Sequence, residues 1–147
     1  MRFKFLFIVV FSIVSVSSFF SQVSNIDFQL AKKYYLDGDY EKAALYYEKI
    51  FEEPEHRLEI YENYKSTFIE LNKFKEAEKL IKTLIKENPN KLKFLVDLGV
   101  VYSLVDRGDK KNQFFDKAIE QINKETFYDN AFDLGLAFEK IGNLEKA

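Results

Sequence analysis

The residues able to carry out chemistry are few and scattered. The chain has one histidine, His56, and no cysteine among its 147 residues. A single histidine without cysteine cannot supply the ligands of a typical zinc site. The absence of cysteine also excludes disulfides and thiolate nucleophiles. The sequence therefore predicts no metal site, and His56 is expected to be a solvated linker residue.

The acidic stretches are better explained as turns than as ion sites. Asp37-Gly38-Asp39 lacks the spaced oxygen ligands of a calcium loop. The runs Glu52–Glu55 and Asp106–Asp109 are charge clusters typical of solvated loops. The chain has neither a Gly-rich phosphate loop nor a nucleophile elbow. We expect a protein that is not an enzyme and that uses no cofactor.

Composition places the chain among globular proteins, with 47% hydrophobic and 31% charged residues. The net charge is −2, and no basic stripe is apparent along the sequence. Nucleic acid is therefore not an expected partner.

The first 21 residues form a separate segment. Arg2 and Lys4 precede an apolar run from Phe5 to Val16, and small residues follow up to Ser21. This layout is typical of a secretory signal peptide cleaved before Gln22. The run is short against the roughly 20 residues that a membrane span needs, so an uncleaved signal anchor is the alternative. The mature chain is expected in the periplasm, in the cell envelope or outside the cell.

After residue 21, the pattern of residue types repeats with a period of 34 residues. Ala43 returns as Ala77, while Tyr47 returns as Ile81 and Phe115. A fixed period of this length indicates stacked copies of one small unit. Apolar residues recur at helical spacing in each copy, without strand-like alternation. The prediction is an all-α protein, an α-solenoid of antiparallel helix pairs.

The pattern inside each copy resembles the tetratricopeptide repeat. An apolar–small pair is followed by an aromatic in the first helix, and an alanine recurs in the second. The pairs are Leu30-Ala31, Leu98-Gly99 and Leu134-Gly135; the aromatics are Tyr34, Phe68, Tyr102 and Phe138; the alanines are Ala43, Ala77 and Ala147. The resemblance implies a superhelical domain over residues 22–147. Its repeats would cover 24–57, 58–91 and 92–125, with a truncated fourth over 128–147.

Three departures from the repeat pattern carry expectations of their own. Lys65 replaces a small residue, so its stem is expected along the core with its amine in water. Lys111 replaces an alanine and Gly108 an apolar residue, which predicts a remodelled third turn. Gly99 and Gly135 lie 36 residues apart, which places an insertion of two residues before the fourth copy.

The resemblance also implies a binding groove, because the first helices of such repeats line a concave face that holds a peptide or a partner helix. The matching positions are Asn25, Phe28, Lys32, Tyr35, Glu59, Glu62, Ser66, Ile69, Lys93, Val96, Val100, Ser103, Asp129, Phe132, Leu136 and Glu139. The predicted partner-binding residues are Phe28, Lys32, Tyr35, Lys93, Val96 and Val100. The alternative is that the apolar members are covered by neighbouring turns.

One subfamily of these repeats grips carboxylate termini of chaperones. Asn63 and Lys93 match its set of residues, whereas Phe28, Lys32 and Asp97 do not. Asp97 would repel a carboxylate, so that activity is not expected.

The functional expectation is an exported scaffold that holds a protein or peptide partner. Its richness in Phe, Lys, Asn and Ile is similar to that of exported proteins of the Bacteroidetes type. The chain stops one turn into a second helix, at Ala147, so a natural continuation is expected. The first alternative is an N-terminal sensor or assembly arm of a larger envelope protein with a catalytic, transmembrane or anchoring region after it. The second is a carbohydrate-binding scaffold. Membrane contact is expected only from an uncleaved signal segment or an anchoring continuation.

Overall fold

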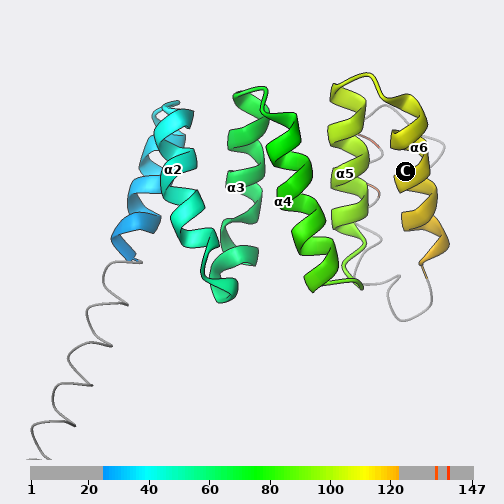
Figure 1. The fold of residues 1–147 in the computed structure, drawn as a ribbon, viewed down its shortest axis with the longest axis horizontal. Helices are drawn as coiled ribbons and strands as arrows, with labels where there is room; N and C mark the ends of the chain where they lie inside the picture. The colour runs from blue at the N-terminus through cyan, green and yellow to red at the C-terminus, as the bar shows by residue number, and fades with distance from the viewer. Residues whose placement is uncertain (1–24, 123–134, 136–138, 140–147) are drawn as a thin grey trace, which may run out of the picture. The chain divides into compact units, whose positions relative to one another are not determined.

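The computed structural model describes residues 25–122 together with Gly135 and Glu139 (Figure 1). The predicted signal peptide, most of the fourth repeat and the two-residue insertion lie outside the described residues.

The described residues form successive helices with short connections (Figure 1). The first helix covers residues 25–36. It is followed by α2 (Tyr40–Phe51), the short 3₁₀ helix η1 (Pro54–His56), α3 (Arg57–Glu70), α4 (Phe74–Glu87), α5 (Lys93–Leu104) and α6 (Gly108–Glu120). No strand occurs in residues 25–122. The predicted fold class, an all-α solenoid of helix pairs, is confirmed.

The spacing of apolar residues explains why these segments are helical. In α4, Ala77, Leu80, Ile81 and Leu84 are buried and recur every three or four residues, so they share one face. The helix ends at Glu87, just before Asn88 and Pro89, because a residue that precedes proline is disfavoured in the helical conformation.

The turn inside each helix pair uses a residue with positive φ. Gly38, Asn72 and Asp106 have φ values of 75°, 56° and 55°, and they lie one repeat period apart. Glycine adopts this conformation freely, and Asn and Asp tolerate it better than other residues do. Each of the three residues therefore ends the first helix of its pair.

The same backbone hydrogen bond closes all three turns. The amides of Asp39, Lys73 and Arg107 donate to carbonyls five residues earlier, at 2.9, 2.8 and 2.9 Å. The prediction of a remodelled third turn is therefore wrong. Asp106 takes the place of glycine in the turn, and Gly108 is the first residue of α6.

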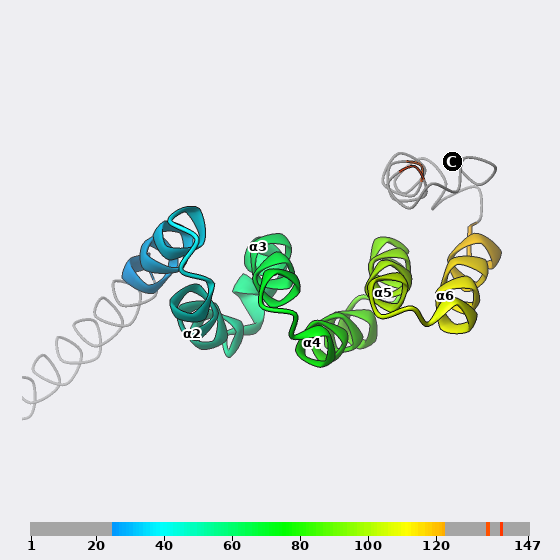
Figure 2. The same ribbon diagram turned by 90° about the horizontal axis from the view of Figure 1, so that it is seen from above.

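The chain divides into two compact units between Thr67 and Phe68. In the first unit, the helix over residues 25–36 lies beside α2 (Figures 1 and 2). Its core is rich in aromatic side chains, since the ring of Tyr64 lies 5.7 Å from that of Tyr47 and 5.8 Å from that of Phe51. Arg57 fixes the connection to α3, because its Nε donates to the carbonyl of Phe51 at 2.8 Å.

In the second unit, α5 lies between α4 and α6 (Figures 1 and 2). Its side chains are buried nearly all round, as expected for a helix with few polar residues. Gly99 provides the close approach to α6. A Cβ atom at this position would lie 2.2 Å from Cε1 of Phe115, so only glycine fits against that ring without movement.

Lys65 agrees with the expectation from the sequence. Its side chain is only 11% exposed. The Nζ atom lies 4.9 Å from the centre of the Tyr61 ring and 2.9 Å from the carboxylate of Glu62. The aliphatic stem is therefore covered while the charge remains paired at the surface.

Candidate partner-binding surfaces

Three of the predicted binding residues share one face of the helix over residues 25–36. Phe28, Lys32 and Tyr35 are four and three residues apart, which places them in one row along the helix. Phe28 and Tyr35 are half-buried, and Lys32 is exposed. We call these three residues the N-terminal face. It presents two partly accessible aromatic rings with a positive charge between them.

Local contacts determine how the side chains of the N-terminal face are held. The ring of Tyr35 meets that of Tyr40 edge-on, with centroids 5.7 Å apart, so Tyr35 is held across the turn into α2. Lys33 forms an ion pair with Asp37 at 3.4 Å. Lys32 has no ion pair among residues 25–122, and its charge is available to a partner.

The other three predicted residues, which lie on α5, are placed differently. Val96 is 1% exposed and belongs to a buried cluster with Leu92, Leu95, Phe115 and Ala118. Val100 is half-buried and packs against the same cluster. The expectation of an exposed Val96 is therefore wrong, because α5 is apolar on several faces and the core covers more of it than the repeat pattern implies.

Lys93 is less accessible than expected. Its Nζ lies 3.5 Å from Oδ2 of Asp97, one helical turn further on. The sequence places Lys93 at the predicted binding face, and it names Asp97 only as a residue that would repel a carboxylate. In the structure the lysine and the carboxylate form a pair, so the positive charge of Lys93 is partly neutralised.

The residues predicted from sequence thus fall into two sets. Phe28, Lys32 and Tyr35 lie together in the first unit, and Lys93, Val96 and Val100 lie in the second. Only the first set combines accessible aromatic surface with a charge that has no described partner.

A polar network in the second unit involves residues that the sequence did not identify. The Tyr102 hydroxyl donates to Oε1 of Glu78 at 2.8 Å, and Lys82 Nζ donates to the same oxygen. The hydrogen bond from Lys82 lowers the pKa of the Glu78 carboxyl. Burial raises the pKa of the Tyr102 hydroxyl, and the hydrogen bond to Glu78 raises it further. Both donors act on the same oxygen of Glu78, and they favour its charged form.

The network lies at the edge of a shallow surface depression on α4. The lining residues are Lys75, Glu78, Lys79, Lys82, Thr83 and Lys86. We call Lys75, Lys79, Lys82 and Lys86 the lysine stripe. Sequence analysis found no basic stripe, because these lysines alternate with Glu76, Glu78 and Glu87 along the chain. The winding of the helix turns Glu76 and Glu87 away from the four lysines, whereas Glu78 stays among them and pairs with Lys82.

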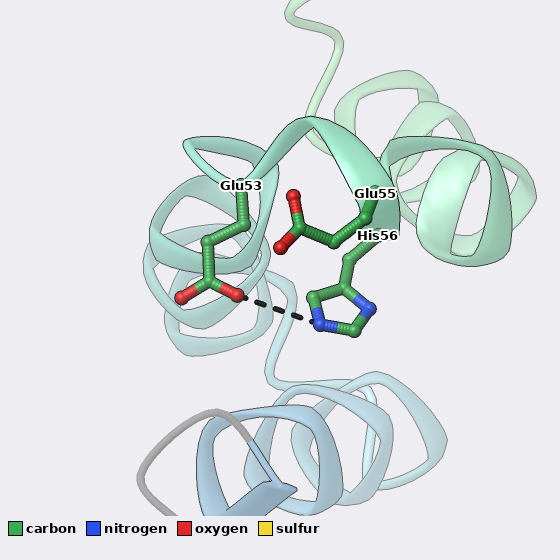
Figure 3. Close-up of side chains that lie close together, drawn as sticks. All are labelled: Glu53, Glu55 and His56. Atoms are coloured by element: carbon green, nitrogen blue, oxygen red, sulfur yellow. Dashed lines mark ion pairs between the residues drawn. The ribbon is translucent and has the colours of Figure 1, made fainter. Parts of the chain in front are cut away.

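A third group of polar side chains lies where η1 runs into α3 (Figure 3). Glu53, Glu55 and His56 bring ligand atoms within 4.8 Å of one another. Nε2 of His56 lies 3.4 Å from Glu53, and its Nδ1 lies 3.6 Å from Glu59. Both nitrogens thus face carboxylates one turn away along the chain, and acidic residues are favourable at a helix N-terminus. This accounts for the cluster, and we assign no metal to it.

None of the helices within the described residues is both long enough and apolar enough to cross a bilayer.

Residues 34–93 match the family model described as Tetratricopeptide repeat. The matched segment contains α2, α3 and α4 and begins at Tyr34. The resemblance deduced from the sequence is thus confirmed over this segment.

Solved structures show the same fold. The crystal structure of MamA protein is similar, with a TM-score of 0.57 and 17% sequence identity, over 86% of this chain and 68% of that chain. At this identity the likeness concerns the fold. Comparison with curated proteins gives no match.

Proposed function

We propose that this chain is an exported scaffold that holds a protein partner on its N-terminal face, formed by Phe28, Lys32 and Tyr35. The tetratricopeptide match supports a role in protein–protein interaction, since such solenoids present their helices as extended binding surfaces. The same match favours a repeat scaffold without catalytic activity. One observation supports the choice of this face as the binding surface. Two half-buried aromatic rings flank a lysine that has no described ion pair.

The physical argument concerns what a partner gains at this face. An aromatic ring that is partly covered already loses little conformational freedom on binding, and it still offers apolar area to bury. Tyr35 fits this description because Tyr40 restrains it. Aromatic side chains dominate the binding energy of many interfaces, and a rim charge mainly sets orientation and association rate. Phe28 and Tyr35 are therefore the proposed anchors, and Lys32 is the orienting charge.

The α5 residues have a smaller part in this proposal. Val96 is buried and Lys93 is paired with Asp97. Val100 and Lys93 are retained as peripheral contacts, and no anchor is assigned to Val96.

Site-specific photo-crosslinking in the native host tests the binding face. A crosslinking residue at Asn25, next to Phe28 on the same helix, should give a discrete adduct with one protein. The matched control is the same residue at Leu45, which is 60% exposed on α2. Tyr35→Ala should lower the adduct by about tenfold without loss of helicity. An equal adduct from Leu45, or one unaffected by Tyr35→Ala, would move binding away from this face.

Export is the second part of the proposal and rests on residues 1–21. N-terminal sequencing of the protein recovered from its host should begin at Gln22 or within a few residues of it. A product that still begins at Met1 would contradict cleavage and leave the signal-anchor alternative.

A further inference from the structure

The lysine stripe occupies a narrow sector of the surface of α4. At about 100° per residue, its four lysines fall within about 60° of one another around the helix axis. The buried residues Ala77, Leu80, Ile81 and Leu84 occupy the opposite side. All four lysines are exposed. The helix thus presents one apolar face to the core and one face of like charge to solvent.

Most of this charge has no ion-pair partner within residues 25–122. Lys82 pairs with Glu78, the one acidic residue among those that line the depression. Lys75, Lys79 and Lys86 have no ion pair among the described residues. A fifth lysine, Lys110 of α6, lies 5.0 Å from the Tyr102 ring, and its charge acts on Glu78. A net positive field is therefore fixed on a chain whose overall charge is negative.

The stripe is specific to α4 and is not a property of every second helix. One repeat period earlier, the four positions carry Glu41, Leu45, Glu48 and Glu52. One period later, on α6, they carry Asp109, Gln113, Asp116 and Glu120. The sign of the charge is reversed at equivalent positions in both directions. A generic solvated helix face does not account for this pattern.

We propose that the lysine stripe of α4 is a second interaction surface, which binds an acidic segment of a protein partner. Like charges held in one row repel one another, and a complementary row of carboxylates removes that repulsion. Thr83 is the one uncharged residue among those that line the depression. The surface belongs to a second helix of a pair and shares no residue with the N-terminal face, so it does not depend on the function proposed above.

The size and surroundings of the stripe favour an acidic protein segment over other polyanions. The row extends about 16 Å, at 1.5 Å per residue, which suits a few carboxylates. No aromatic side chain lines the depression, so bases have nothing on which to stack. No large apolar side chain lines it for insertion into lipid. A broad anionic surface would also meet the acidic residues at the equivalent positions of α6.

Fluorescence anisotropy of a labelled oligoglutamate peptide against the full chain is the direct test. Binding should be measurable at low salt and should disappear at about 1 M salt, where the Debye length is about 3 Å. The triple variant Lys75→Glu, Lys79→Glu, Lys86→Glu should lose about tenfold or more in affinity, because three exposed charge contacts become repulsive.

A matched triple variant provides the control. Lys73→Glu, Lys91→Glu and Lys117→Glu make the same change in net charge at exposed positions outside the stripe. This variant should bind the peptide within about twofold of the wild type if the effect is local. Circular dichroism should show equal helicity in both triples, since all six side chains point away from the core.

Four results would overturn the proposal. They are absence of peptide binding at low salt, equal loss in the two triples, and tighter binding of anionic vesicles than of the peptide. The fourth is salt-sensitive self-association that the stripe triple abolishes while the peptide does not bind. That last result would assign the stripe to a second copy of the chain.

Discussion

The two units contain the same aromatic stack and bury it to different degrees. In the first unit, Tyr34 stacks on Tyr46 with ring centroids 5.6 Å apart, and Lys42 lies 5.2 Å from the Tyr34 ring. Two repeat periods later, Tyr102 stacks on Phe114 at 5.5 Å, and Lys110 lies 5.0 Å from the Tyr102 ring. The repeat thus reproduces a stacked pair with a cation over it, which is a favourable arrangement for aromatic rings.

The surroundings of the two stacks differ. Tyr102 is 2% exposed, and its hydroxyl donates to Glu78 of the preceding helix α4. Tyr34 is half-buried, and its hydroxyl has no hydrogen bond among residues 25–122. The stack thus forms within one helix pair, whereas the hydrogen bond of Tyr102 comes from the preceding helix α4.

Replacing Tyr102 or Tyr34 with alanine should give the largest difference in the free energy of unfolding between the two stacks. Tyr102→Ala removes a fully buried ring and leaves a cavity, so the free energy of unfolding should fall by about 3–5 kcal/mol. Tyr34→Ala should cost about 1–2 kcal/mol, because its ring is only partly buried. Urea unfolding followed by circular dichroism measures both values. Equal losses would show that the preceding helix contributes little to Tyr102.

The two units also differ at the small residue in the first helix of the repeat. Gly99 and Ala31 occupy equivalent positions, and both are buried. Gly99→Ala should destabilise the chain by about 1–3 kcal/mol, because the new methyl group collides with the Phe115 ring.

Combining Gly99→Ala with Phe115→Leu provides the check for this collision. The smaller side chain should recover part of the loss, which appears as a coupling energy of about 1 kcal/mol in a double-mutant cycle. Purely additive losses would mean that the contact between the two residues is not the cause.

The polar network of the second unit predicts a dependence on pH. The pKa of Glu78 is lowered from its ordinary value of 4.5 by its hydrogen bond with Lys82. A lowered pKa in the folded state adds stability that is complete above the unfolded value and is lost as pH falls through the folded value. Glu78→Gln should therefore cost about 1 kcal/mol at neutral pH and nothing once the pH falls below the folded pKa.

Urea midpoints measured from pH 7 down to about pH 3 test this sign. Glu76→Gln is the control, because Glu76 is exposed and has no described ion pair. A difference between wild type and Glu78→Gln that persists unchanged at the acid end would place the effect in packing.

The smallest expected effect concerns the turns. Asp106 has φ of 55° where the first repeat has Gly38. Asp106→Gly should stabilise the chain by about 0.5–1 kcal/mol, because glycine adopts this conformation without steric cost. Gly38→Ala should destabilise it by about 1 kcal/mol for the opposite reason. Thermal melts of the two variants should therefore shift in opposite directions, and shifts of the same sign would contradict a shared turn.

Much of the fold could be predicted because the features that define the repeat act over short stretches of the chain. The 34-residue period, the apolar spacing and the residues Gly38 and Asn72 act within one or two turns of chain, so they predict helices and their connections. The third turn was predicted wrongly because Asp106 adopts the positive φ that Gly38 adopts in the first turn. Gly108, the glycine nearest to this turn in the sequence, does not have that conformation.

The candidate surfaces were predictable only in part. The sequence indicated that Phe28, Lys32 and Tyr35 share one helix face, because helical spacing alone decides that. It could not show that Val96 is buried or that Lys93 pairs with Asp97, since both depend on packing and side-chain geometry in the folded unit. The lysine stripe was not predicted because acidic residues interrupt it along the chain, and the four lysines come together only around the axis of α4.

The sequence by itself thus determined the class of fold, the length of the repeat and the residues that face inward in most helices. These properties follow from periodicity and from backbone preferences that act over short distances. The tertiary structure decided which aromatic rings stay accessible, which charges find a partner and where charges of one sign gather. Those outcomes depend on neighbours that are far apart in the chain, and on the burial that only the packed helices provide.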